Sequence, residues 1–192
     1  MTTLWLTGEP EADRLLSDDP FALLVGMLLD QQYPMEHAFR GPWKIAQRLG
    51  TLDPGVIAGT DPEEFVALAT TPPAIHRYGR AMAGRVQELA RVVVDTYDGD
   101  ASRLWTTAAS GGELLRRVKA LPGFGEQKAK IFVALLAKQR GVRPDGWETT
   151  AGDYALPGHR SVADVTGPDE LQSVRAYKKA AKAAAKAGTT TA

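Results

Sequence analysis

The stretch "LPGFGEQKAKIFVALLAKQRG", residues 121–141, contains a proline and two glycines within its first five positions. Proline fixes φ, whereas glycine admits positive φ and leaves its backbone amide unobstructed. An amphipathic helical pattern begins directly after the second glycine. The sequence therefore predicts a tight turn that leads into a helix whose first amides, at the positive end of its dipole, face outward.

A second helical pattern, "GELLRRVKA", precedes this turn, so residues 113–139 are predicted to form a helical hairpin with "LPGFG" as its connection. Leu121 and Phe124 are the apolar residues of the connection, and we expect both to pack between the two helices. An ordinary helix–loop–helix turn is the alternative, because Pro-Gly connections are common.

The same turn is suited to bind phosphate. Gly123 and Gly125 leave bare amides at the start of the second helix, where an anionic oxygen binds readily. Lys128 and Lys130 lie within the first two turns of that helix and add positive charge. Contacts of this type grip a nucleic-acid backbone without reading its bases.

Composition narrows the possible classes of protein and site. The chain has 192 residues, no cysteine, and three histidines that are far apart in the sequence. Disulfides, thiolate zinc sites and cysteine-bound iron–sulfur clusters are therefore excluded, and we expect no metal site built from side chains. The start of the chain lacks the pattern of a signal peptide, and the longest apolar run, "FALLVGMLL", is too short to span a bilayer. We therefore expect a cytoplasmic protein with no membrane association.

The formal net charge is zero, but the charges are unevenly distributed. Residues 1–70 contain four basic and eleven acidic residues, whereas residues 101–143 contain nine basic and two acidic residues. Residues 171–192 add five basic residues and no acid. Positive charge therefore gathers around the hairpin and in the tail, where a polyanion could bind; solvated helix faces are the other explanation.

Helical patterns and helix-start signals recur along the whole chain, and no strand pattern is present. The segment "DPFALLVGMLLDQQ" begins with an Asp-Pro start signal and is apolar along most of its length, which is typical of a central buried helix. A last helix is predicted from Pro168, and its Ala/Lys-rich end is expected to fray. The chain is thus predicted to be all-α, with an N-terminal segment (1–19), a helical core (20–143) and a C-terminal segment (144–192).

Two segments together resemble the helix–hairpin–helix (HhH-GPD) superfamily of base-excision DNA glycosylases, in a cysteine-free subgroup without an iron–sulfur cluster. One is the hairpin "LPGFGEQKAK", and the other is "LLVGMLLDQQYP", about ninety residues earlier. The resemblance covers about residues 20–145. It implies two helical lobes with a cleft between them, the N-terminal segment packing on the second lobe, and a monomeric, nucleoid-associated enzyme that binds double-stranded DNA containing a damaged base.

The resemblance also implies which residues touch DNA. In family members a Gln-containing turn after the early helix fills the space that a flipped nucleotide leaves, and Gln32 falls on that position, with Gln31 and Tyr33 beside it. An amide can hydrogen-bond the orphaned base, and a ring can stack on it. An exposed helix end is the alternative for this turn. The DNA-binding set implied in the hairpin is Leu121, Gly123, Phe124, Gly125, Gln127, Lys128 and Lys130.

The chemistry follows from the same comparison. Gln127 stands where family members that also cut the strand have a lysine, and an amide cannot form a Schiff base, so a monofunctional glycosylase without lyase activity is implied. Family spacing places the catalytic aspartate eighteen residues further, at Asp145, where "DGWE" also has the form of a capping box. Asp153 is the reserve candidate and Asp30 the third. No cofactor is implied, with a monovalent cation on the hairpin carbonyls left as an option.

Two other functions stay open. A noncatalytic DNA-binding protein would keep the hairpin and the wedge but have lost the acid, because "VRPDGWETT" departs from the residues that usually surround the family's aspartate. A helical protein-interaction domain would use the hairpin only as a turn. The sequence does not identify the damaged base, although several aromatic side chains could stack on it: Tyr33, His37, Trp43, Trp147 and Tyr154.

Overall fold

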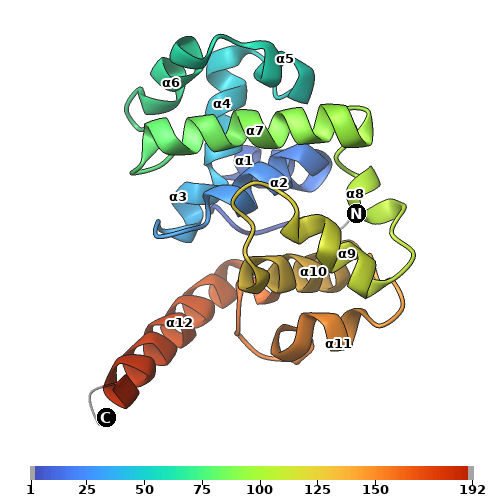
Figure 1. Ribbon diagram of the computed structural model, residues 1–192. Helices are drawn as coiled ribbons and strands as arrows, with labels where there is room; N and C mark the ends of the chain where they lie inside the picture. The colour runs from blue at the N-terminus through green and yellow to red at the C-terminus, as the bar shows by residue number, and fades with distance from the viewer. Residues whose placement is uncertain (1–2, 190–192) are drawn as a thin grey trace.

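The computed structural model describes residues 3–189, including their side chains except at residues 182 and 185–189. Every regular element in this part is a helix, so the all-α prediction is confirmed (Figure 1). The elements are α1 Pro10–Asp18, α2 Pro20–Leu29, α3 Met35–Phe39, α4 Gly41–Leu49, α5 Pro54–Gly59, α6 Pro62–Thr70, α7 Gly79–Tyr97, α8 Arg103–Thr106, α9 Gly111–Lys119, α10 Glu126–Arg140, α11 Trp147–Ala151, the 3-10 turns η1 Gly152–Ala155 and η2 Val162–Asp164, and α12 Pro168–Thr189. Among the described residues, no helix combines the length and the apolar character that a membrane crossing requires.

The helix boundaries follow the local start and stop signals of the sequence. Asp19 caps α2, because its Oδ1 accepts the backbone N–H groups of Phe21 and Ala22 at 2.8 and 3.2 Å. Asp61 caps α6 in the same way. Gly50 ends α4 with a φ of 82°, a conformation that glycine adopts without strain. These signals act within a few residues, so they can be recognised in the sequence alone.

Helix α2 is the centre of the fold, as its apolar composition predicts. Every residue of α2 after Pro20 is buried. The helix packs against α1, α3, α4 and α7 (Figure 1). Burial on all sides explains why the helix has no polar face.

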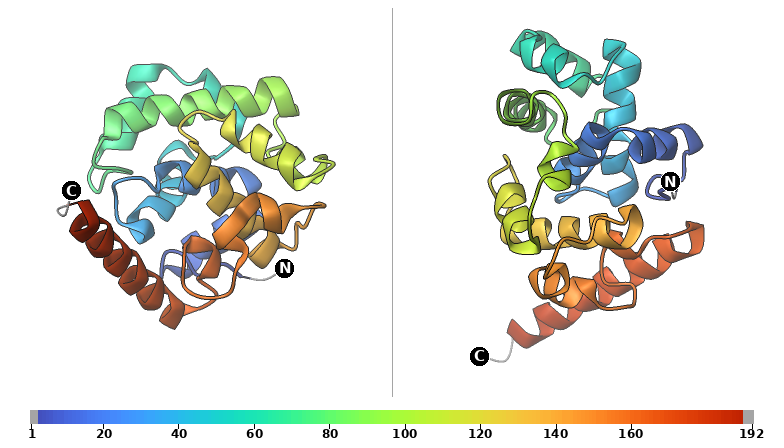
Figure 2. Two further views of the ribbon diagram at one scale, coloured as in Figure 1. Left: turned by 60° about the horizontal axis from the view of Figure 1, so that its bottom comes forward. Right: turned by 90° about the vertical axis from the view of Figure 1, so that its right-hand side faces the viewer.

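The closest helix packing falls into two sets. The first contains α1 to α7, and the second contains α8 to α11, both 3-10 turns and α12, which packs on η2 near its start. One continuous apolar core nevertheless runs through both sets. Beyond that start, α12 runs obliquely past the lower part of the molecule, and its later turns project beyond the other helices in Figures 1 and 2. The tail beyond Thr189 lies outside the described residues, and the fraying of its end stays a prediction.

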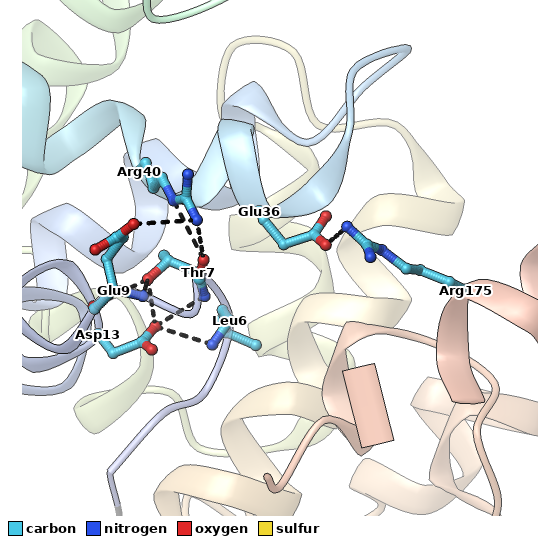
Figure 3. Close-up of polar contacts among 7 residues, drawn as sticks. All are labelled: Leu6, Thr7, Glu9, Asp13, Glu36, Arg40 and Arg175. Carbon is cyan, nitrogen blue, oxygen red and sulfur yellow. Dashed lines mark hydrogen bonds and ion pairs between the residues drawn. The ribbon is translucent and has the colours of Figure 1, made fainter. Parts of the chain in front are cut away.

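The buried carboxylate of Asp13 holds the N-terminal segment against α1 by hydrogen bonds (Figure 3). Its Oδ1 accepts the backbone N–H groups of Leu6 and Thr7 and the Thr7 hydroxyl, each at 2.9 Å. Arg40, at the start of α4, donates to the Thr7 carbonyl at 2.7 Å. The segment thus packs with the first set of helices. Arg140 of α10 links it to the second set by donating to the Ser17 carbonyl, and packing on a second lobe stays a prediction.

The predicted capping box at "DGWE" is wrong. Helix α11 begins at Trp147, and its N-cap is Gly146 with a φ of 74° and no side-chain cap. The carbonyl of Asp145 instead accepts the backbone N–H of Gly111, the first residue of α9, at 2.8 Å. A Cβ on Gly111 would come 2.7 Å from Cα of Trp147. Close packing of this turn on α9 therefore decides its conformation, in place of a local cap.

Two glycine-to-alanine substitutions in helices test the packing around α2. A Cβ on Gly26 would stand 2.5 Å from the Phe39 ring, so Gly26→Ala should lower the free energy of unfolding by about 1–3 kcal/mol, because the core would be overpacked. Gly84 in α7 has open space around the same position, so Gly84→Ala should raise it by about 0.5–1 kcal/mol. Urea unfolding measures both changes. A Gly26→Ala protein as stable as Gly84→Ala would contradict the packing described here.

Candidate functional site

Two buried apolar side chains close the hairpin turn between α9 and α10. Leu121 and Phe124 are 4% and 5% exposed, and the Phe124 ring lies edge-on to Phe132 of α10 with ring centroids 6.2 Å apart. Their predicted packing is confirmed. Gly123 has a φ of 77°, and a Cβ there would come 2.6 Å from Cδ1 of Leu28 in α2. Both the dihedral and the close approach require glycine.

The start of α10 leaves its first amides without a side-chain cap. Gly125 is the N-cap, and open space surrounds the position that a Cβ would take. The carboxylate of Glu126 lies in this first turn and pairs with Lys119 at 2.7 Å and with Lys130 at 3.1 Å. Hydrogen bonds from these two lysines hold the pKa of Glu126 below its usual value. The helix end is open to an anion, but Lys130 is already engaged by Glu126.

Lys128 joins the hairpin helix to the end of α2. Its Nζ donates to the carbonyl of Leu28, 100 residues away in sequence, at 2.9 Å, and lies 5.6 Å from the centre of the Phe124 ring. Burial lowers the pKa of Lys128 to about 8; the carboxylate of Asp30 opposes this shift and Arg85 adds to it. Lys128 therefore fixes how the hairpin and the turn after α2 lie relative to each other.

The turn after α2 presents one free amide side chain. The side chain of Gln31 is held by hydrogen bonds within the protein: its Nε2 donates to the Leu28 carbonyl at 2.8 Å, and its Oε1 accepts from Arg85 at 3.4 Å. Gln32 is exposed, makes no side-chain hydrogen bond among the described residues, and has a φ of 51°. The left-handed region costs a residue with a Cβ about 1–2 kcal/mol, and such residues cluster at functional sites. The turn after α2 therefore has a defined conformation of the kind found at functional sites, and it is not a frayed helix end.

An open cleft of about 1260 Å³ lies between this turn and the hairpin helix. Its residues come mainly from the turn after α2, the first two turns of α10, the segment from Ala151 to Tyr154, and α12. Ligand pockets usually measure about 300–1000 Å³, so the space is ample for one nucleotide.

The predicted wedge and part of the predicted hairpin set meet in this cleft. Its lining includes Gln31, Gln32, Tyr33, Gln127, Lys128 and Lys130. Gln127 donates to the Tyr154 hydroxyl at 2.9 Å, which joins α10 to the segment after α11. The other four hairpin residues lie elsewhere: Leu121 and Phe124 are in the core, and Gly123 and Gly125 are exposed outside the cleft.

The three candidate acids occupy different places. Asp30 ends α2 and lines the cleft, with its side chain 14% exposed and its Oδ2 4.0 Å from Nζ of Lys178. Asp153 lines the same cleft and is exposed. Asp145 is exposed beside the start of α9, outside the cleft, and the length of that helix puts about 13 Å between this point and the hairpin turn. Asp145 therefore does not share the cleft that Asp30 and Asp153 line, and its catalytic role stays a prediction.

Positive charge predominates in the cleft. Among the side chains that the structure describes, two carboxylates and five cationic groups line the cleft, the cationic groups being Arg77, Lys128, Lys130, Arg160 and Lys178. Nε of Arg160 is buried without a hydrogen-bond partner. The sequence indicated the two hairpin lysines and the basic C-terminal helix that contains Lys178 for this role. It gave no sign that Arg77 and Arg160 would join them.

The docking of α12 beside the cleft and the position of His76 were not predicted from the sequence. Tyr177 and Lys178 of α12 line the cleft, and Arg175 pairs with the buried carboxylate of Glu36 in α3 (Figure 3). The basic residues near the end of the chain were the only signal of this arrangement. His76 packs on Tyr33 with ring centroids 4.6 Å apart, and it follows a proline-rich loop that carried no signal of a site.

No protein family, no curated protein and no solved structure matches the chain. In the described part of the chain, no three His, Asp or Glu side chains lie close enough together to hold a metal ion. A monovalent cation on the hairpin carbonyls stays a prediction; of these carbonyls, that of Leu121 accepts the Phe124 N–H at 3.2 Å. The function must be inferred from the geometry and charge of the cleft itself.

Titration of Lys128 tests the electrostatics of the cleft. The pKa of Lys128 should be about 8, and Asp30→Asn should lower it further, because the substitution removes the carboxylate that stabilises the ammonium. NMR of the lysine side chains against pH measures both values.

The same shift links pH to stability. The folded state holds the Lys128 proton less tightly than the unfolded chain, so the free energy of unfolding should rise as the pH increases from about 8 to the ordinary lysine value of 10.5. Lys128→Met should abolish that rise. A Lys128 that titrates at its ordinary value would contradict its burial between the hairpin and α2.

Proposed function

We propose that the chain is a monofunctional DNA glycosylase of base-excision repair, which binds duplex DNA with a damaged base, extrudes the damaged nucleotide into the cleft and hydrolyses its N-glycosidic bond. The observation that carries the proposal is the cleft, where a partly buried carboxylate, a turn with a free glutamine and the first turns of an uncapped helix face one another. The HhH-GPD arrangement, with the two sets of helices as its two lobes, belongs to the same proposal. The proposal also includes that the protein is a monomer and acts on DNA in the cytoplasm.

The DNA backbone would bind at the start of α10. The first amides of this 15-residue helix lack a side-chain cap, and Gly125 leaves room for a phosphate to approach. The phosphate would displace Glu126 from Lys119 and Lys130, and both ammonium groups would then face the strand. Exposed ion pairs of this kind are weak, so their exchange costs little.

Gln32 would fill the space that the extruded nucleotide leaves. Its side chain is the free amide of the turn, and an amide both donates to and accepts from an orphaned base. The cationic lining of the cleft would offset the phosphates on either side of the extruded sugar.

Asp30 is the proposed catalytic acid. As the base departs, positive charge develops on the sugar, and a carboxylate held close to it stabilises that charge and orients the attacking water. Asp30 is 14% exposed, so water screens its charge only partly, and its Oδ2 lies 4.0 Å from Nζ of Lys178. Asp153 lines the same cleft but is exposed, so its field on the sugar would be weaker.

The absence of a lyase step is proposed from Gln127. An amide cannot attack C1′ of the sugar, and the Gln127 side chain is held by Tyr154. Of the three lysines that line the cleft, Lys128 has the lowered pKa that would suit an attacking amine, but its Nζ donates to the Leu28 carbonyl.

A noncatalytic DNA-binding protein is the alternative. The location of Asp145 outside the cleft favours it, because the acid expected from family spacing would then be missing from the site. The two functions share the DNA contacts and differ in the release of a base. A helical protein-interaction domain, the third possibility, would bind no DNA.

Substitution of Gly125 tests the DNA contact. Gly125→Leu should weaken duplex binding about tenfold, because the side chain blocks a phosphate from the α10 amides, whereas stability should change little in the open space there. Gly59→Leu, at another open position at the end of α5, is the matched control and should bind DNA like the wild type. Fluorescence anisotropy over a series of salt concentrations measures affinity.

Equal affinities of the two leucine variants would argue against the hairpin as the DNA grip. Affinity that does not fall with salt would argue against phosphate contacts altogether.

Three aspartate-to-asparagine variants test the chemistry. On a panel of duplexes with alkylated, oxidised or deaminated bases, Asp30→Asn should release base about 10²- to 10⁴-fold more slowly than the wild type, with duplex binding kept. Asp145→Asn should retain full activity, and Asp153→Asn should lose less than Asp30→Asn.

Base release by Asp30→Asn at the wild-type rate would rule out the proposed acid. No release by the wild type on the whole panel, with binding intact, would favour the noncatalytic alternative. Covalent trapping of the wild type on DNA by borohydride would contradict the absence of a lyase step, and loss of trapping in Lys128→Met would identify the amine.

A further inference from the structure

His76 is a buried histidine that the proposed chemistry does not use. It lies between α6 and α7 and is 1% exposed. The backbone N–H of Tyr78 donates to its Nδ1 at 3.0 Å, so Nδ1 carries no proton, and Nε2 must be the N–H that donates to the Gln31 carbonyl at 3.0 Å. Burial lowers the pKa of His76, the hydrogen bond to Gln31 opposes this shift, and the charges of Arg77 and Lys128 add to it. The ring is therefore neutral at pH 7, with one acceptor and one donor, both in use.

The Gln31 carbonyl belongs to the peptide that leads into Gln32. Because a peptide unit is planar, a hydrogen bond that fixes this carbonyl also fixes the direction of the Gln32 N–H and limits the φ that Gln32 can adopt. That φ is 51°, in the left-handed region that residues with a Cβ seldom occupy. A residue stays in this region only where its surroundings hold it there.

Both neighbours of Gln32 are held in place. The side chain of Gln31 donates to Sδ of Met82 at 3.8 Å as well as to the end of α2, and the Tyr33 ring packs against the ring of His76. Gln32 itself makes no side-chain hydrogen bond among the described residues. The backbone of the turn is thus held in place, whereas the side chain of Gln32 is free. His76 contacts the residue on each side of Gln32: the carbonyl of Gln31 and the ring of Tyr33.

We infer that His76 is a positioning residue: its neutral imidazole, by donating to the Gln31 carbonyl and packing on Tyr33, holds Gln32 in the left-handed conformation that aims its amide into the DNA helix. The inference rests on the proposed function, in which Gln32 is the wedge. It extends that function to a residue of a different segment, the loop before α7, which contacts neither the sugar nor the base. Gln32 would enter the duplex without a further ordering cost, since its backbone is already set.

Three substitutions separate the two hydrogen bonds of His76. His76→Gln keeps a donor where Nε2 stands and is the conservative variant. His76→Phe keeps a ring against Tyr33 but removes the donor. His76→Asn keeps only an acceptor for the Tyr78 N–H, and it replaces His76→Phe should that variant fail to fold.

Insertion of Gln32 into DNA is measured on a duplex that carries 2-aminopurine opposite a tetrahydrofuran abasic-site analogue. The fluorescence of 2-aminopurine rises when a side chain enters the helix and unstacks that base. His76→Phe should reduce the insertion equilibrium about five- to tenfold, the worth of one hydrogen bond. Its binding to an intact duplex should change less than twofold, and His76→Gln should stay within about twofold of the wild type in both assays. Gln32→Ala should show at least the same loss, and adding His76→Phe to it should cause no further loss, because His76 acts through Gln32.

A second measurement needs no DNA. The three-bond coupling between the amide and α protons of Gln32 reports its φ in the free protein, and it should change in His76→Phe but not in His76→Gln. An unchanged coupling in His76→Phe would overturn the inference whether or not the protein binds DNA. A changed coupling with full wedge insertion, or additive losses in the double variant, would overturn it as well. Absence of insertion by the wild type would overturn the proposed function. The coupling constant would still show whether His76 holds the φ of Gln32, so the two failures can be told apart.

Discussion

The hydrogen bond from Lys128 to the carbonyl of Leu28 is the contact on which the site depends. It joins the first turns of the hairpin helix to the last turn of α2, two segments that are 100 residues apart in sequence. Gly123 allows the same approach, because any side chain there would collide with Leu28. These contacts, together with the shared apolar core, place the turn that carries Gln32 beside the helix that carries Gln127. Lys128 is half-buried, and the loss of hydration lowers its pKa to about 8. Shifted pKa values of this kind cluster at functional sites.

Local chemistry made most of the fold predictable. The Asp-Pro starts of α2 and α6, the glycine that ends α4 and the turn before α10 are signals that act within a few residues. The apolar composition of α2 announced its burial for the same reason: a helix without a polar face has to be covered on every side. The hairpin, with Leu121 and Phe124 in the core and Gly123 in a left-handed conformation, follows equally from its residue types.

The site was less predictable, because it depends on where distant segments meet. Counting from Gln127 led to Asp145, but such a count assumes a continuous path, and the chain instead docks residues 145–147 on the start of α9 before Asp153 returns to the cleft. Asp30 was the weakest candidate in the sequence, and its place in the cleft is decided by Lys128 and by α12. Lys130 was expected to add charge to a phosphate contact, and in the free protein it pairs with Glu126 in the first turn of the same helix. Ion pairs and tertiary contacts of this kind leave no period or motif in a single sequence.

The cleft, taken as a whole, combines features that a base-extruding enzyme needs: an exposed amide on a rigid turn, an accessible helix start, predominantly cationic walls and a partly desolvated carboxylate. The most direct test is a crystal structure of the protein bound to a duplex that contains a tetrahydrofuran abasic-site analogue. The account predicts a phosphate on the first amides of α10, Gln32 inside the base stack and the carboxylate of Asp30 facing the analogue's ring. A duplex bound along another face, with Gln32 outside the stack and Asp30 remote from the analogue, would contradict it.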